Sequence, residues 1–218
     1  SVGDAVERVV TDSNILRGYT LNSSTQSVDE AADVTGTQNA DHLMNGVWNG
    51  TDDVIKGLDG GDNIYGYDGS DVLVGNGGSD ALYGDTSNQI HNYGDDIIIG
   101  GEGDDSIYGG HEIALTSHDD GTDTAVYFGN YADYNITLIP DGQNPHINVI
   151  DTRYDASKGV DHVDNAGLDT YETGDNLYSI EKLVFADGIY VVEDGKLVQE
   201  GEKVLDYEID ITAALADV

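Results

Sequence analysis

Aspartates recur at a fixed spacing in the middle of this chain. From residue 57 to residue 83 it reads as three nonapeptides, GLDGGDNIY, GYDGSDVLV and GNGGSDALY, with Asp62, Asp71 and Asp80 at the sixth places. Less regular copies on either side add Asp41, Asp53, Asp96, Asp105 and Asp123. Carboxylates stacked in phase repel one another unless a cation lies between them. Calcium takes carboxylate and carbonyl oxygens, whereas magnesium prefers water and strict octahedral geometry. The spacing therefore predicts calcium ions between the repeats.

The same period predicts the elements that position these aspartates. Glycine opens each regular repeat and returns at its fourth place, while Ile64, Leu73 and Leu82 hold the eighth place. Six glycine-rich residues form a tight turn, and the other three form a strand too short to pair as a hairpin. If each strand and turn reverses the chain, two repeats make one coil of about 18 residues. Successive coils then stack their strands in parallel and bury the eighth-place side chains between two sheets.

Ordinary antiparallel hairpins are the alternative, since the Asp-Gly pairs at 59–60 and 68–69 also favour hairpin turns. Hairpin strands would show several alternating apolar positions, but each repeat shows one.

In a stack of coils, aspartates one coil apart lie about 4.8 Å from each other. We treat the interval before Asp123 as two periods, with Ala114 at the skipped aspartate. We then expect one edge to carry Asp53, Asp71 and Asp96, and the other to carry Asp41, Asp62, Asp80, Asp105 and Asp123.

The composition excludes several classes of function. The 218 residues include 43 acidic and 8 basic ones, a net charge of -35, so nucleic acid and anionic membranes are unsuitable partners. Without cysteine the chain can form neither disulfides nor thiolate metal sites. No apolar run is long enough to span a bilayer, and no N-terminal signal peptide is visible. The chain opens on Ser1, which suggests a piece of a longer polypeptide.

The repeat GGEGDDSIY (100–108) matches the GGxGxDxUx nonapeptide of RTX (repeat-in-toxin) proteins, which bacteria export by type I secretion. The chain resembles this family over residues 36–126, and residues 123–138 and 177–192 resemble the β-rich segment that follows such repeats in large RTX adhesins. The resemblance implies an all-β fold, a right-handed parallel β-roll followed by a small β-rich cap. We expect a linker or cap at 1–33, the roll at 34–126, the cap at 127–199 and a type I secretion signal at 200–218.

The resemblance also implies a ligand set. In the family, carbonyls at the second and fourth places of one loop, with its aspartate, face carbonyls at the first and third places of the loop one coil later, with its aspartate. Here Leu58, Gly60 and Asp62 would face Gly75, Gly77 and Asp80. The expected ligands are Asp53, Asp62, Asp71, Asp80, Asp96, Asp105 and Asp123, with Gly57, Leu58, Asp59, Gly60, Gly66, Asp68, Gly69, Gly75, Gly77, Gly78, Gly101 and Gly103. Asp41 is a further candidate in a repeat that has Asn39 at its fourth place. Adjacent aspartate pairs give about four to six ions.

These features favour a calcium-dependent folding and secretion module of a large extracellular bacterial protein, an adhesin, with calcium and the type I secretion machinery as partners. The segment is not expected to be an enzyme, since His111-Glu112 begins an HExxH-like string but Leu115 replaces its second histidine, and no GxSxG motif is present. Two alternatives remain open. One is an adhesion domain that binds a carbohydrate or protein, for which the outward ninth-place Tyr65, Tyr83 and Tyr108 could form the surface unless residues after 126 cover them. The other is the tail of an exoenzyme whose catalytic domain lies upstream.

Overall fold

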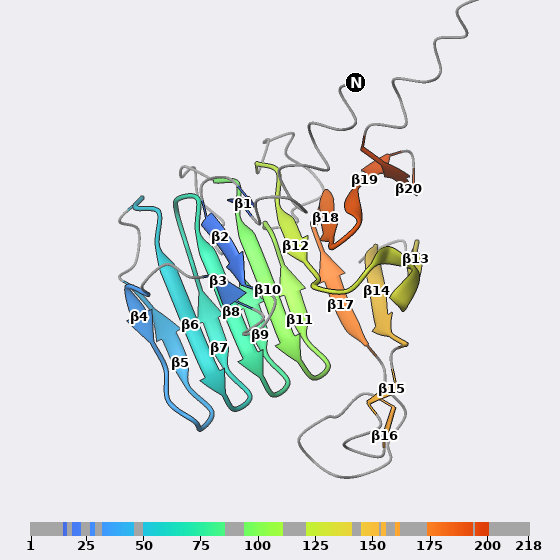
Figure 1. Ribbon diagram of the computed structural model, residues 1–218. Coiled ribbons are helices and arrows are strands. Elements are labelled where there is room, and N and C mark those ends of the chain that lie inside the picture. Colours follow the sequence, from blue (N-terminus) through green and yellow to red (C-terminus); the bar gives the residue numbers. More distant parts are fainter. Residues whose placement is uncertain are drawn as a thin grey trace, which may run out of the picture.

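The computed structural model describes residues 15–16, 19–22, 27–28, 32–45, 50–85, 94–110, 121–140, 145–152, 154–155, 160–161, 174–193 and 195–200. Most of these residues form a flattened coil whose strands lie in two facing sheets, one of eight strands and one of seven (Figure 1). Within the described residues, no helix is long and apolar enough to cross a membrane.

Each coil of the roll gives one strand to each sheet. The eight-stranded sheet takes β4 (Val34–Thr35), β6 (Val54–Asp59), β8 (Val72–Gly77), β10 (Ile97–Glu102) and β12 (Thr124–Val126). The seven-stranded sheet takes β5 (His42–Met44), β7 (Asn63–Tyr65), β9 (Ala81–Tyr83) and β11 (Ser106–Tyr108). Neighbours within each set pair in parallel. The predicted all-β parallel roll is therefore confirmed, and the antiparallel hairpin alternative is wrong.

The interior of the roll is lined by the eighth-place aliphatic residues. Ile64 and Leu82 are Cα partners in one sheet, and Leu73 and Ile98 are partners in the other. All four have a relative exposure of 0% and belong to one hydrophobic cluster. Burying a leucine or isoleucine fully stabilises a fold by about 1.5–3 kcal/mol. The eighth-place residues of successive repeats thus build one continuous core inside the roll.

A second apolar layer covers the outer face of the eight-stranded sheet. The seventh- and ninth-place side chains of its strands, such as Val72, Val74, Ile97 and Ile99, are buried there together with Val28. Val28 lies in β3 (Ser27–Val28), the last strand of a small antiparallel sheet with β1 (Ile15–Leu16) and β2 (Tyr19–Asn22). Lys56 Nζ donates a hydrogen bond of 2.6 Å to the Val28 carbonyl. The N-terminal segment therefore contacts the roll on this face.

After β12 the chain leaves the roll and later returns to it. It forms a 3₁₀ turn (Tyr131–Asp133), the hairpin of β13 (Tyr134–Ile139) and β14 (His146–Asp151), and the pair β15 (Tyr154–Asp155) and β16 (Val160–Asp161). Then β17 (Asp175–Tyr178) pairs in parallel with β11, and β18 (Lys182–Phe185) pairs in parallel with β12. The antiparallel strands β19 (Gly188–Glu193) and β20 (Lys196–Gln199) follow. The parallel stack thus gains one more coil from within residues 127–199.

Candidate metal centre

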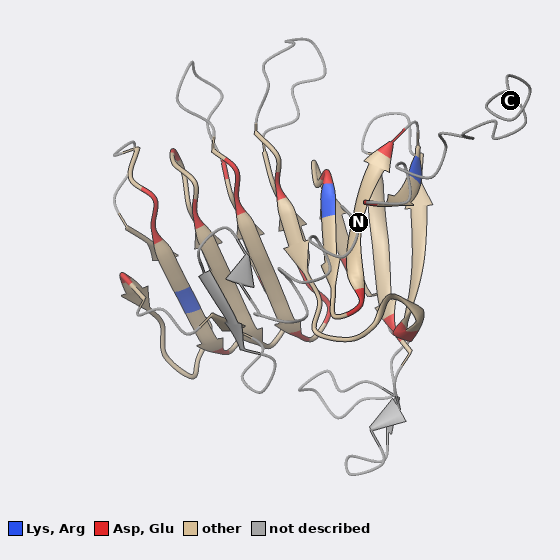
Figure 2. Cartoon of the chain, turned by 45° about the horizontal axis from the view of Figure 1, so that its top comes forward, with Lys and Arg blue, Asp and Glu red and all other residues tan. Residues whose placement is uncertain are grey.

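The sixth-place aspartates form two columns along the edges of the roll, each linked by backbone-to-carboxylate hydrogen bonds. In the first column, the backbone N–H of each aspartate donates to Oδ1 of the next one, one coil later, at 2.8–2.9 Å. Its members are Asp41, Asp62, Asp80, Asp105 and Asp175. The second column has the same pattern and distances, and ends on a glutamate Oε2. Its members are Asp53, Asp71, Asp96, Asp123 and Glu181. Figure 2 shows acidic residues at the strand ends along both edges.

The placement of Asp123 corrects one sequence-based expectation. Its Oδ1 accepts the Asp96 N–H at 2.9 Å, so Asp123 lies in the second column and not beside Asp105. Asp123 follows Asp96 by 27 residues and lies one coil later in the same column, so the interval contains no skipped ligand. Ala114 lies outside the described residues. The position after Asp105 is taken by Asp175, 70 residues further along the chain.

In six of the column aspartates the second carboxylate oxygen is buried and accepts no hydrogen bond. This holds for Oδ2 of Asp53, Asp62, Asp71, Asp80, Asp96 and Asp105. A buried polar atom without a partner is costly, and a buried charge even more so. Such atoms repeated along two columns point to a ligand that is common to all of them.

The space beside these oxygens is kept open by first-place glycines. A Cβ added at Gly75 would collide with Asp80 Oδ2 and with the Gly100 carbonyl oxygen of the next coil. The same pair of neighbours, an aspartate Oδ2 and a carbonyl one coil later, surrounds the Cβ positions of Gly57, Gly66 and Gly84. None of these glycines has a positive φ. They are therefore required for the space beside the carboxylate and not for their backbone conformation.

Carbonyl groups of adjacent loops meet across the same gaps. The Gly60 carbonyl abuts Gly78 of the next coil, and the Gly77 carbonyl accepts the Gly60 N–H at 2.6 Å. The second-place residues Leu58 and Tyr67 have φ angles of 82° and 73°, in the left-handed region. Such residues store strain of order 1–3 kcal/mol and occur where function requires them. The loops that hold Leu58, Gly60 and Asp62 on one side and Gly75, Gly77 and Asp80 on the other are thus brought together as expected.

Burial shifts the protonation of both columns. Burial, with a smaller contribution from neighbouring carboxylates, raises the pKa of Asp71 and Asp80 to about 7. The pKa values of Asp96 and Asp105 are raised well above the usual range, first by burial and then by Asp123 and Asp175 respectively. A divalent cation in the gap would reverse these shifts, because it favours the charged form.

The donor set suits a hard cation. Among the described residues, no three His, Cys, Asp or Glu side chains come together into a side-chain metal cluster. A site in these gaps would therefore need backbone carbonyls in addition to its carboxylates. Zinc prefers nitrogen and sulfur ligands in a tetrahedron, whereas calcium takes six to eight oxygens and tolerates irregular geometry. The residues present fit calcium.

The ends of the first column differ from its interior. Asp41 Oδ2 accepts hydrogen bonds from the Thr37 N–H at 2.6 Å and from the Thr37 hydroxyl at 2.8 Å. Asp175 Oδ2 accepts the Tyr127 hydroxyl at 3.0 Å. Protein groups thus satisfy the oxygen that has no partner at Asp62, Asp80 and Asp105. The interior gaps are the stronger candidate sites.

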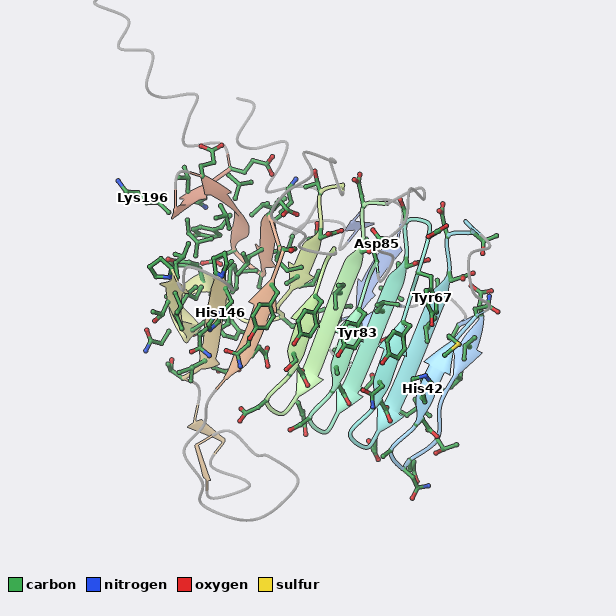
Figure 3. All side chains as sticks on the ribbon, turned by 180° about the vertical axis from the view of Figure 1, so that it is seen from behind. His42, Tyr67, Tyr83, Asp85, His146 and Lys196 are labelled. Atoms are coloured by element: carbon green, nitrogen blue, oxygen red, sulfur yellow. The ribbon has the colours of Figure 1, made fainter. Side chains whose placement is uncertain are left out.

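The ninth-place tyrosines form a stacked row on the outer face of the seven-stranded sheet, where Figure 3 labels Tyr83. Ring centroids lie 4.8 Å apart for Tyr65–Tyr83, 4.7 Å for Tyr83–Tyr108 and 4.7 Å for Tyr108–Tyr178, with interplanar angles of 5–8°. His42 and His146 lie beyond the two ends, tilted against Tyr65 and Tyr178. Neighbouring rings therefore occupy the ring faces that a stacked sugar would need. A ligand surface at these tyrosines stays a prediction.

Three acidic residues were missed by sequence reasoning. Asp175 and Glu181 continue the two columns but belong to no nonapeptide, so only strand pairing reveals them. Asp85 is buried beside the second column at the second place of its repeat, where the consensus expects no side chain. The HExxH-like string at His111-Glu112 and residues 201–218 lie outside the described part of the chain.

Part of this chain matches a known protein family. A family model described as the RTX calcium-binding nonapeptide repeat (four copies) matches residues 49–88 and 92–111. Among solved structures, the chain is similar to the solution structure of the AlgE6R3 subunit from the Azotobacter vinelandii mannuronan C5-epimerase, with 21% identity and a TM-score of 0.33 over 59% of this chain and 72% of that one. No curated protein matches the chain. The family match covers the loops that carry Asp53, Asp62, Asp71, Asp80, Asp96 and Asp105, so residues 49–88 and 92–111 are RTX calcium-binding nonapeptide repeats, and the described part of the chain folds as a parallel β-roll.

Proposed function

We propose that calcium ions bind in the gaps between adjacent loops of both columns and that this binding drives folding of the domain. The observation that carries the proposal is the set of six buried Oδ2 atoms without hydrogen-bond partners. Each ion would be held by the aspartates of two successive coils and by the carbonyls of their loops. The aspartates proposed as ligands are Asp53, Asp62, Asp71, Asp80, Asp96, Asp105 and Asp123.

Four gaps combine an Oδ2 of this kind with a first-place carbonyl from the next coil. They pair Asp62 with Gly75, Asp80 with Gly100, Asp71 with Gly84, and Asp96 with Gly109. The gap between Asp123 and the Ser179 carbonyl and the gap that follows Asp41 are further candidates. About four to six ions per chain are consistent with this arrangement.

Calcium binding would contribute much of the stability of the folded domain. A site held at 100 times its dissociation constant stabilises the folded state by about 2.7 kcal/mol, so four sites contribute about 10 kcal/mol. This is comparable to the whole stability of an ordinary domain. Without calcium, buried carboxylates that face one another leave the roll little net stability at a net charge of -35. The domain would then stay unfolded in a calcium-poor cytosol and fold at the millimolar calcium found outside cells.

A calcium titration followed by circular dichroism tests the coupling. We expect a disordered spectrum in excess EGTA and a cooperative gain of strand signal at submillimolar to millimolar calcium, with magnesium far less effective at equal ionic strength. Native-like strand content in EGTA would contradict the proposal.

The folding step gives the domain a role in export. We propose that it belongs to a large extracellular bacterial protein, an adhesin, that leaves the cell unfolded through a type I system with a signal within residues 200–218. Deleting residues 209–218 should abolish export while calcium-induced folding of the purified chain persists. Unchanged export would place the signal elsewhere, and loss of folding would give these residues a structural role instead.

Two other functions are alternatives to this proposal: direct binding of a ligand by this domain, and an enzyme whose catalytic domain lies upstream. The RTX repeat is itself a calcium-binding family and not a catalytic one. A glycan array probed with the calcium-loaded chain tests direct binding, and the stacked tyrosine row leads us to expect no signal. The gene sequence upstream of this segment would identify an enzyme of which the domain is the tail.

A further inference from the structure

We infer that Asp85 is an additional calcium ligand, whose side chain completes the site between the loop that contains Asp96 and the loop that contains Asp123. The inference rests on the proposed function, because it concerns one of the second-column gaps. It departs from the nonapeptide pattern, in which the second place offers only its backbone.

Asp85 lies against this gap. Its backbone N–H donates to the Gly109 carbonyl at 2.8 Å. The same carbonyl and Asp96 Oδ2 both border the Cβ position of Gly84, the residue that precedes Asp85. Figure 3 shows Asp85 at the edge of the roll, beyond the end of the strand that carries Tyr83.

The side chain is buried and only half satisfied. Asp85 has a relative exposure of 3%. Its Oδ2 accepts the Gly94 N–H at 3.3 Å, whereas its Oδ1 is buried and accepts no hydrogen bond. A carboxyl group in this state needs a proton or a cation at the second oxygen.

The surrounding charges favour a cation over an isolated proton. Burial, and after it the carboxylates of Asp123, Asp71 and Asp68, raise the pKa of Asp85 to about 9. Asp96 Oδ2 is also buried and accepts no hydrogen bond. One divalent ion in the gap would satisfy both oxygens and offset the repulsion among the carboxylates.

The enlarged loop explains why a side chain is needed here. Fourth-place glycines elsewhere have φ angles of 118–130°, as at Gly60, Gly78 and Gly103, but Gly94 has no positive φ. Residues 86–92 are inserted between the second and third places of this repeat, so its sequence departs from the regular nonapeptide at this point. Asp85 bonds across the insertion to Gly94 and would supply a charged oxygen in compensation. Because affinity rises with the number of charged ligands, this gap would be the tightest calcium site of the chain.

The test compares Asp85→Asn with Asp95→Asn in the 218-residue chain, with calcium titrated by isothermal calorimetry. Asparagine at 85 can still accept the Gly94 N–H but loses the charge. Asp95 is an exposed residue of the same loop whose Oδ1 accepts the Thr122 N–H at 2.8 Å, a bond that asparagine also keeps. We expect Asp85→Asn to remove the tightest binding step or weaken it by about 10- to 100-fold, and Asp95→Asn to change it less than about threefold.

If Asp85→Asn and the unaltered chain bound calcium with the same affinities, the inference would be overturned. Asp85 would then be a protonated residue that only accepts the Gly94 N–H. If the unaltered chain bound no calcium, the proposed function itself would fail. If Asp85→Asn did not fold at any calcium concentration, crystals of the unaltered chain grown in calcium would decide. An ion at about 2.3–2.6 Å from an Asp85 carboxylate oxygen supports the inference, and its absence overturns it.

Discussion

The backbone N–H of Asp62 donates a hydrogen bond to Oδ1 of Asp80, 2.8 Å away in the next coil. The same carboxylate directs its other oxygen, which has no hydrogen-bond partner, to the space beside Gly75. Asp80 therefore has two tasks: one oxygen holds the register of the preceding coil, and the other is available for a metal ion. The two tasks can be separated by substitution.

Asp80→Asn should keep the register bond and lose the charged ligand, whereas Asp80→Ala should lose both. We expect Asp80→Asn to bind about one ion fewer and to lose about 2–3 kcal/mol of unfolding free energy in calcium. Asp80→Ala should lose a further 1–3 kcal/mol, roughly, because the buried Asp62 N–H is left without an acceptor. Urea unfolding in saturating calcium measures both values. Asp187→Asn is the matched control, since Asp187 is exposed and accepts the Tyr131 N–H far from the columns. Equal stability of the two Asp80 variants would contradict the division of tasks.

The number of bound ions follows from the column assignment. With Asp123 in the second column, each column has three adjacent pairs among the sixth-place aspartates of the repeats, so we expect about four to six ions in the roll. The pair Asp41–Asp62 should be the weakest, because Thr37 already satisfies Asp41 Oδ2. A crystal structure grown in calcium, with anomalous scattering to locate the ions, provides the count. Fewer than three ions would rule out this geometry.

Acid should act in opposite directions on the metal-free and calcium-loaded chains. The pKa values of Asp71 and Asp80 are raised to about 7 in the folded state, above their value of 3.8 without burial. The metal-free fold therefore binds more protons than the unfolded chain between these pH values, and its stability decreases as the pH rises from about 4 to 7. Calcium competes with the same protons, so at pH 5.5 a site with one such carboxylate should bind about 30-fold more weakly than at pH 8.

Two measurements check this prediction. Thermal melts in EGTA at pH 8 and pH 5.5 should show more residual structure at the lower pH, and calcium titrations at the same two values should show the lower affinity there. A calcium affinity that is independent of pH would mean that the columns are already ionised in the metal-free chain.

Gly75→Ala should impair calcium binding without any conformational strain at the substituted residue. The added Cβ would occupy the space between Asp80 Oδ2 and the Gly100 carbonyl, where an ion would have to lie. We expect about one ion fewer and a loss of about 2–3 kcal/mol in calcium. Gly195→Ala is the contrasting control, because Gly195 has φ 70° and open space around its Cβ position. That variant should cost about 1–2 kcal/mol of backbone strain and leave the ion count unchanged. An unchanged ion count for Gly75→Ala would argue against a site in this gap.

The nine-residue period by itself determined the parallel roll and its core. One aliphatic residue per repeat, as at Ile64, Leu73 and Leu82, cannot stabilise an isolated hairpin but fills the interior once coils stack. The same period placed Asp62 and Asp80 in one column and Asp53 and Asp71 in the other. Local spacing is sufficient there because each loop has the regular length and the coil geometry is fixed.

The sequence also indicates which sheet is buried on its outer face. The runs VLV (72–74) and III (97–99) are apolar at three successive positions, which indicates strands that are buried on both faces. Two strands of the other sheet, Asn63–Tyr65 and Ser106–Tyr108, have one apolar residue between a polar side chain and a tyrosine. The outer layer that includes Val28 covers the first set, and the stacked tyrosines lie on the second.

Only the tertiary structure decided where the columns end. An interval of 18 residues before Asp123 can be two short repeats or one repeat with an enlarged loop, and spacing cannot distinguish them. The pairing of β10 with β12 selects the second, which places Asp123 above Asp96. Asp105 meets Asp175 across 70 residues, and Asp123 meets Glu181 across 58, because β17 and β18 return to the growing edges of the two sheets. Such contacts depend on strand pairing between distant segments, for which a local period contains no information.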